Sequence, residues 1–181
     1  YDGMDATRIS AYEIKGIYPL PVHAVESLYY ATELVAALAA RQGETLNVDP
    51  ATLISEATSK GLASLDVNDR INHLAGRVAE RRMRDALLHH MPDRSALSSR
   101  NTAPISISVP SPFPVELARL QSLRNAGNLQ GIIARYPVRE SGVLDAVAKA
   151  LRFPGRSDYE RAALARVGAD DKLRDALRGR L

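Results

Sequence analysis

The residues best suited to chemistry are carboxylates within the first thirty positions. Asp2 and Asp5 belong to a turn sequence that would follow a strand, and Glu26 comes after a short apolar run, Ile17 to Val22. Carboxylates at the ends of neighbouring strands can converge on one hard cation, because Mg²⁺ prefers oxygen ligands and retains several waters. Such a cation would stabilise charge on a phosphodiester and activate a water for attack. The alternative is structural, with Asp2 and Asp5 as turn or cap residues and Glu26 as a helix cap.

A row of arginines forms the second candidate site. Helical periodicity places four of them within about 60° of each other on a helix predicted from Asp66 to Met91. They are Arg70, Arg77, Arg81 and Arg84. The neighbouring sector of that helix is apolar and can be buried. Exposed guanidinium groups in a row can contact successive phosphates of nucleic acid, with little sequence preference and strong salt dependence. A solvated helix face, or ion pairs between domains, is the alternative, and Glu80 and Asp85 would neutralise part of the charge.

A third charged stretch, Arg135 to Ser141, carries two arginines around a Tyr-Pro break. It suits docking on an acidic partner domain or, equally, a junction between two helices. The sequence contains no phosphate-binding Gly-Lys-Ser/Thr loop, no dinucleotide-binding Gly-rich fingerprint and no Gly-x-Ser-x-Gly motif. We therefore expect any ATP binding to belong to a domain upstream of these residues.

The elements that must position the acidic residues form a small α/β unit. A helix is predicted from Ala6 to Lys15, with Gly16 ending it. The run Ile17 to Val22 has two prolines, which cannot donate to a sheet, so it predicts an edge strand at best.

Helical patterns follow. We predict helices over 27–42, from the Asp49-Pro50 start signal onward, over 66–91, and over 115–126, 128–136, 140–153, 157–167 and 170–180. Ser157 to Glu160 predicts a capping box, and Asp170 predicts the cap of the last helix. The Pro- and Ser-rich stretch 95–114 predicts a linker or edge strand. The expected fold is therefore mainly α, a helical bundle with an N-terminal α/β remnant, divided into 1–94, the linker and a basic 115–181 subdomain.

Composition agrees with this fold. Of 181 residues, 45% are hydrophobic and only 5% aromatic, so Ala and Leu must build much of the core, and both favour helix. Cysteine is absent, which excludes disulfides and thiolate sites and fits a cytoplasmic location. No apolar run is long enough for a membrane span. Basic residues outnumber acidic ones by 13 to 8 from Val115 onward, a bias that suits nucleic acid, an acidic partner or solvated helix faces.

Two short motifs carry a family resemblance. Tyr1-Asp2-Gly3 resembles the end of an Asp-x-Asp strand motif whose first Asp would lie upstream, and Val22 to Tyr30 resembles a Ser-Ile-Glu-Asn-Tyr-Leu type signature. Together they resemble the Toprim-like domain that accompanies ABC-type ATPase domains in bacterial defence proteins related to the overcoming-lysogenization-defect nucleases. The resemblance covers residues 1 to about 32. It departs from the family at Ser27, where Asn is common.

The resemblance implies that Asp2 is the second Asp of a Toprim metal site and Glu26 its later Glu, with Asp5 as added acidic density. The chain opens on a turn without an initiator Met, so we expect a piece of a longer protein that is inactive by itself. The implied function is the C-terminal part of a Toprim-like module in an ATP-dependent, Mg²⁺-dependent phage-defence nuclease that binds DNA, partnered by its upstream ATPase domain. The resemblance is compatible with an oligomer and implies no membrane partner. The alternative is a non-catalytic helical interaction domain that docks such an ATPase.

Overall fold

The computed structural model describes residues 25–89 and 111–179, together with positions 10, 12, 14–16, 91, 95 and 98. Its regular structure, within that part of the chain, is entirely helical: eight α-helices and three 3₁₀ helices. The prediction of a mainly α protein is confirmed. Residues 1–9 and 17–24, which carry most of the expected α/β remnant, lie outside the described residues, and no strand is present among those described.

Five helical elements form the first half of the described chain, and they are η1 (Val25–Tyr30), α2 (Thr32–Leu46), α3 (Pro50–Ala63), η2 (Ser64–Asp66) and α4 (Arg70–His89). The predicted start of α3 is confirmed, because the Asp49 side chain accepts a hydrogen bond from the Ala51 N–H at 3.3 Å and Pro50 occupies the first turn. A proline is tolerated there because its missing N–H has no partner within the helix.

The predicted helix over 27–42 is wrong at both ends. A 3₁₀ helix occupies its first residues, Ala31 is extended with ψ 145°, and α2 begins at Thr32. Gly43 does not stop α2, which continues to Leu46 and ends at Asn47 in the left-handed region, φ 52°. Gly43 instead permits close packing, because a Cβ there would lie 2.5 Å from the Val48 carbonyl oxygen.

The predicted helix over 66–91 also begins later than expected. Val67 is extended and the next two residues, Asn68 and Asp69, have positive φ of 53° and 57°, so α4 starts at Arg70. Asn and Asp tolerate this left-handed conformation better than most residues, and here they form the corner between η2 and α4.

Six elements form the second half, and they are α6 (Phe113–Asn125), α7 (Leu129–Arg135), η3 (Val138–Glu140), α8 (Val143–Ala150), α9 (Arg156–Ala169) and α10 (Asp171–Arg178). Asp170 caps α10 as predicted, accepting from the Leu173 N–H at 3.1 Å. The predicted capping box at Ser157–Glu160 is wrong. Helix α9 starts a residue earlier, with Gly155 as its N-cap, and the Asp145 side chain accepts from the Arg156 N–H at 3.3 Å.

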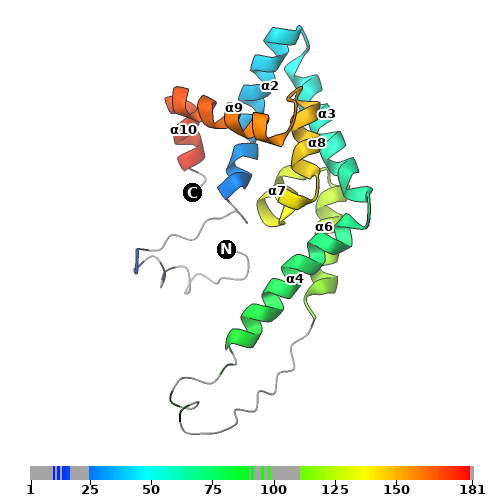
Figure 1. The fold of residues 1–181 in the computed structure, drawn as a ribbon, viewed down its shortest axis with the longest axis vertical. Coiled ribbons are helices and arrows are strands. Elements are labelled where there is room, and N and C mark those ends of the chain that lie inside the picture. The colour runs from blue at the N-terminus through cyan, green and yellow to red at the C-terminus, as the bar shows by residue number, and fades with distance from the viewer. Residues whose placement is uncertain are drawn as a thin grey trace.

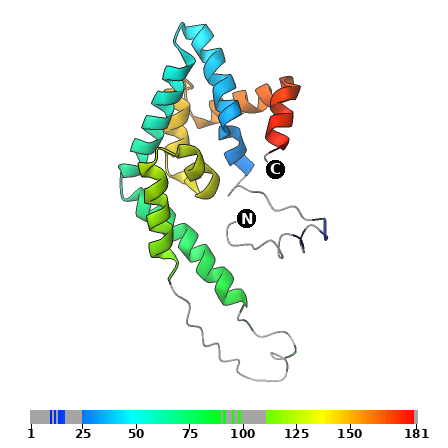
Figure 2. The ribbon, with the colours of Figure 1, turned by 180° about the vertical axis from the view of Figure 1, so that it is seen from behind.

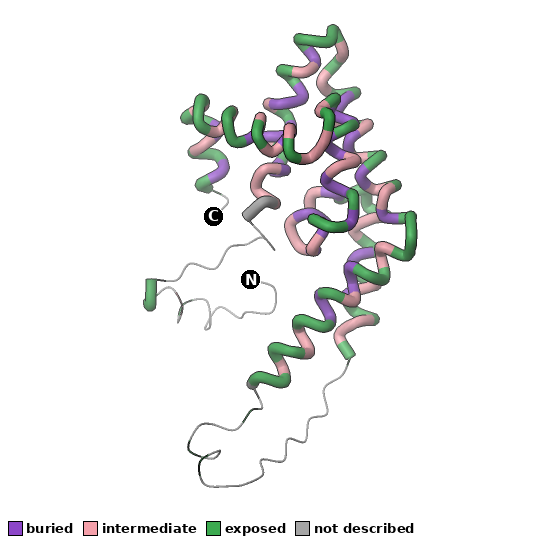
Figure 3. The backbone as a smooth tube through the Cα atoms, in the orientation of Figure 1, coloured by how far each residue is buried: buried purple, intermediate pink, exposed green. Residues whose placement is uncertain are grey.

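The helices form a body and a projecting arm. In the body α3 packs along α8, and α2 lies between α3 and α9, with α10 beside it (Figures 1 and 2). Helices α4 and α6 pair antiparallel and extend away from the body; we call this pair the arm. Figure 3 shows that buried residues concentrate in the body, whereas the far half of α4 is mostly exposed.

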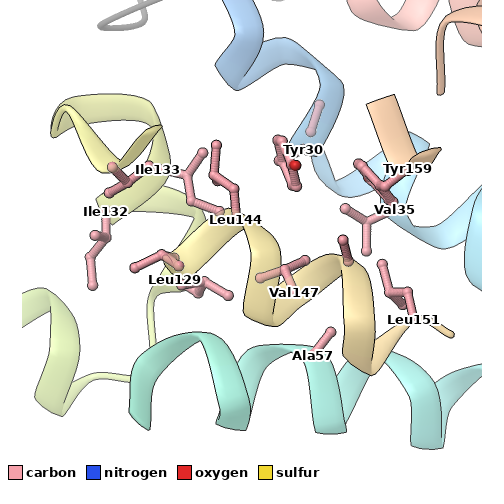
Figure 4. Packing of buried hydrophobic residues seen from close by; sticks show 14 of the residues in the cluster. Tyr30, Val35, Ala57, Leu129, Ile132, Ile133, Leu144, Val147, Leu151 and Tyr159 are labelled. Carbon is pink, nitrogen blue, oxygen red and sulfur yellow. The ribbon is translucent and has the colours of Figure 1, made fainter. Parts of the chain in front are cut away.

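One hydrophobic core joins helices from both sides of the predicted linker. Leu34, Leu53 and Leu144 are all buried in it, and Figure 4 shows α7 and α8 side chains meeting those of α2 and α3. The helices approach closely at Gly61, where a Cβ would lie 2.7 Å from a Leu129 methyl carbon and 3.0 Å from a Val147 methyl carbon. None of the described helices is both long and apolar enough to cross a membrane.

Candidate functional site

The predicted metal ligands lie at or beyond the edge of the described chain. Asp2 and Asp5 are outside the described residues, and Glu26 is described in its backbone only, as the second residue of η1. Among the described residues no group of three or more His, Asp or Glu side chains is arranged to hold a metal. The Mg²⁺ assignment therefore stays a prediction.

The element that carries Glu26 is held firmly on the helical body. The Ser27 hydroxyl donates to the Ile133 carbonyl of α7 at 2.9 Å, and the Tyr159 hydroxyl of α9 donates to the Tyr29 carbonyl at 2.8 Å. The Gln130 side-chain amide donates to the Tyr30 carbonyl. The backbone next to Glu26 is thus tied to two helices more than a hundred residues later in the sequence.

An aromatic stack completes this anchor. Tyr30 and Tyr159 are fully buried, and their rings stack with centroids 4.7 Å apart (Figure 4). Phe153 meets the Tyr159 ring edge-on at 5.3 Å. Burial, with a smaller effect of the nearby Glu160 charge, raises the pKa of both phenols above the ordinary value. Both hydroxyls therefore stay protonated at neutral pH and keep donating hydrogen bonds.

The predicted arginine row lies on one continuous helix, but its members differ in surroundings. The Arg70 guanidinium donates a hydrogen bond to the Ser64 carbonyl at 2.7 Å, on the side of α4 that faces η2. Arg77 faces Glu140 of η3 across 3.6 Å. Arg84 pairs with Glu80 of its own helix at 2.8 Å. Arg81 is exposed. Arg77, Arg81 and Arg84 are therefore the exposed members of the row, and Arg77 and Arg84 have acidic neighbours.

A buried charge cluster lies where the arm leaves the body. Glu116 in the first turn of α6 is 0% exposed, and its carboxylate meets the guanidinium of Arg82 of α4 at 2.9 Å and that of Arg135 of α7 at 3.2 Å. The Tyr136 hydroxyl lies 3.2 Å from the Glu116 carbonyl oxygen and 3.4 Å from its carboxylate. We call Glu116, Arg82, Arg135 and Tyr136 the Glu116 cluster. It joins three helices through a single carboxylate.

The cluster identifies the acid that the Arg135 to Ser141 stretch contacts. A helix junction is present at this stretch, because Arg135 at the end of α7 pairs with Glu116 of α6. Docking on a separate acidic domain stays a prediction. Burial, reinforced by the negative charge of Glu116, raises the pKa of Tyr136 to about 12. Removing one partner from a buried ion pair typically costs about 3–5 kcal/mol, because the remaining charge stays desolvated.

The sequence contained a signal for this cluster that the arginine-row interpretation passed over. Arg82 continues the apolar face of α4, four residues after Val78, and Glu116 lies four residues before the buried Leu120 on α6. A charged residue at an apolar position of a helix predicts a buried partner of opposite sign. Which residue supplies that partner depends on the tertiary fold.

A shallow cleft of about 400 Å³ lies between the starts of α8 and α9. Two arginines and two aspartates line it, together with Gly142, Pro154, Gly155 and Ser157. They are Arg139, Arg156, Asp145 and Asp158. A hydrogen bond from Lys149 holds the pKa of Asp145 below its ordinary value; burial opposes this shift, and the Arg156 N–H adds to it. The Arg156 guanidinium is engaged by the Arg139 carbonyl at 3.0 Å and by Glu160 at 3.3 Å. The charged side chains of the cleft are thus largely paired with residues outside its lining: Arg156 with Glu160, Asp145 with Lys149 and Asp158 with Arg161.

Comparison with known proteins gives no relative: no family model, no curated protein and no solved structure matches the chain.

Proposed function

We propose that the chain is the C-terminal part of a Toprim-like module in an ATP-dependent, Mg²⁺-dependent cytoplasmic defence nuclease. The observation that supports this most is the anchoring of η1. A metal-binding carboxylate must be held in place, because preorganisation of the ligands supports affinity and catalysis. Ser27, the residue after Glu26, is tied to α7, and Tyr29 and Tyr30 are tied to α9 and α7. The helical body would therefore serve as the rigid support of the Glu26 position.

The donor set of the proposed site suits Mg²⁺. Asp2, Asp5 and Glu26 offer only carboxylate oxygens, the hard ligands that this ion prefers. The ion would supply charge stabilisation and an activated water. In this proposal Asp2 and Glu26 bind the ion, Asp5 adds negative charge nearby, and the upstream ATPase domain supplies nucleotide hydrolysis.

Metal binding tests the proposal directly. In the longer protein that contains this chain, calorimetry with Mg²⁺ or Mn²⁺ should show binding that Asp2→Ala or Glu26→Ala abolishes. Glu44→Ala, which removes an exposed carboxylate from α2, is the matched control and should leave binding unchanged. Equal binding by all variants removes the metal role of Asp2 and Glu26.

Backbone contact with nucleic acid is the second element of the proposal, and it rests on the outward arginines of α4. Arg81→Ala/Arg84→Ala should weaken DNA binding and reduce its salt dependence, because fewer counterions would be released. Arg161→Ala/Arg178→Ala removes two equally exposed arginines from α9 and α10 and is the control. Identical affinities and salt slopes for both double variants would exclude the arginine row as the contact.

A non-catalytic interaction domain is the competing proposal, and a different observation favours it. Arg70, Arg77 and Arg84 each have a partner within the chain, which leaves less positive charge available for phosphates than the sequence pattern suggests. A domain that only docks its ATPase would bind DNA weakly with a flat salt response, and its metal binding would be unaffected by Glu26→Ala. These two results together would favour docking over catalysis.

A further inference from the structure

We infer that the Glu116 cluster is an orientation lock that fixes the direction in which the arm projects from the body. This inference concerns α4, α6 and α7 alone and is independent of the proposed function. Helix α6 lies between α4 and α7, so the angle of the arm depends on how α6 is held on both sides.

Few apolar side chains near the cluster are fully buried, although Phe113 and Leu117, on either side of Glu116 in the sequence, are partly buried against the core. The buried side chains of α6, a helix that is described in full, are Glu116 and Leu120, one charged and one apolar. On the described part of α4 the buried apolar positions end at Ala79, one turn before Arg82. Beyond the cluster no described residue of α4 or α6 is fully buried, and Leu88 and Val115 are 58% and 60% exposed. Glu116 is therefore the fully buried residue nearest the start of α6, and its carboxylate contacts both α4 and α7.

The contacts in the cluster are directional, unlike those of an apolar interface. Apolar burial depends on area and has no preferred direction. A carboxylate that receives guanidinium groups from two helices fixes distances and angles, because charge-assisted hydrogen bonds require particular geometries. Here the Arg82 and Arg135 side chains, 30% and 17% exposed, approach Glu116 from α4 and α7, and the Tyr136 hydroxyl bonds the α6 backbone. Each of the three helices thus contributes at least one directional contact to the same point.

The experiment separates orientation from stability. The chain has no cysteine, so Leu88→Cys on the arm and Ser59→Cys on the exposed face of α3 provide two unique spin-label positions. Pulsed electron paramagnetic resonance then gives the distance distribution between arm and body. The key variant is Arg82→Met/Glu116→Leu/Arg135→Met, which replaces the charges with apolar side chains, a change that often preserves stability.

We expect a single narrow distribution for the parent chain, and a distribution roughly twice as wide, or one with a second maximum, for the apolar triple variant. Two controls should stay narrow. Asp66→Asn breaks the exposed Arg124–Asp66 pair between η2 and α6, and Tyr159→Ala destabilises the body while leaving the Glu116 cluster intact. A triple variant that melts cooperatively and keeps the narrow distribution overturns the inference. If the triple variant does not fold, the same measurement is made on Glu116→Gln. A broader distance distribution supports the inference, and an unchanged width overturns it.

Discussion

The attachment of η1 to the body and the attachment of the arm to α7 depend on different interactions. At one, η1 is attached to the body by a Tyr30–Tyr159 stack that belongs to the hydrophobic core, with Glu160 accepting a hydrogen bond from the Tyr30 hydroxyl at 3.5 Å. At the other, the arm is attached to α7 by the Glu116 cluster, in which a fully buried carboxylate meets two arginines. Both lie in the same chain and both involve buried tyrosines. They differ in whether the buried surface is apolar or charged.

The difference predicts different sensitivities. An apolar attachment loses stability in proportion to the volume removed from it and is little affected by charge. A buried ion-pair attachment is most sensitive to loss of one partner, and is less affected when all partners are replaced together. Mutations at the two attachments should therefore differ in their cost to stability.

The largest effect is expected at the aromatic attachment. Tyr159→Ala removes the ring that stacks on Tyr30 and contacts Phe153, and it also removes the hydrogen bond to the Tyr29 carbonyl. We expect a loss of about 3–5 kcal/mol in the free energy of unfolding, the range typical of a buried aromatic truncated to Ala. Urea denaturation measures it. Tyr159→Phe should lose only about 0.5–1.5 kcal/mol, because it keeps the ring and loses one hydrogen bond. Similar losses for both variants would show that the hydroxyl, and not the stack, holds η1.

The next effect is expected at the Glu116 cluster. Arg82→Ala leaves the buried Glu116 with Arg135 and Tyr136 as partners, so one charge-assisted contact is lost and the carboxylate is less compensated. We expect a loss of about 2–3 kcal/mol by urea denaturation. Adding Glu116→Leu to Arg82→Ala should not add a further loss of the same size, because it removes the uncompensated charge. Strictly additive losses would contradict the interpretation of the cluster as one electrostatic unit.

The sequence predicts the backbone of this fold better than it predicts the side-chain contacts. The mainly helical class, the Asp49-Pro50 start of α3 and the Asp170 cap of α10 were predictable, because they depend on neighbouring residues. The division of 27–42 into η1 and α2 could not be predicted. Local propensity favours a helical conformation at Ala31 and a helix end at Gly43, and neither is what the structure has. Their actual conformations follow from contacts with α7, α9 and the loop at Val48.

The site residues show the same limit. The periodicity of α4 correctly gave a helix with arginines on one face, yet it could not show that Arg70 is directed at the Ser64 carbonyl. Nor could it show that Arg82 is the arginine with a buried partner, because Glu116 is 34 positions away along the chain, in another helix. The capping box at Ser157 failed for a related reason, since Asp145 from another helix caps α9 in its place.

Alkaline pH provides a graded test of both attachments. Burial raises the pKa of Tyr136 to about 12 and those of Tyr30 and Tyr159 higher still, against an ordinary value of 10.0. Below about pH 10 these phenols are protonated in both states and their contribution is complete; above it the unfolded chain ionises first, so stability falls as pH rises. We expect about 1.4 kcal/mol lost per buried tyrosine by about pH 11, measured by urea denaturation. Tyr136→Phe should make the decline of stability with pH shallower. An unchanged slope would show that folding does not raise the pKa of the Tyr136 hydroxyl.

The smallest effect is expected from a second arginine on the same helix. Arg84 pairs with Glu80 at 2.8 Å, about the same distance as Arg82 from Glu116, but the side chains of Arg84 and Glu80 are both well exposed. Water and salt already stabilise such charges, so Arg84→Ala should cost only about 0.3–0.5 kcal/mol, and less at high salt. Arg82→Ala should keep its larger cost in salt, because the Glu116 cluster is shielded from ions. Equal costs for the two arginines, or the same salt dependence, would mean that burial does not distinguish the ion pairs of α4 and that the two attachments of this molecule are less different than their geometry indicates.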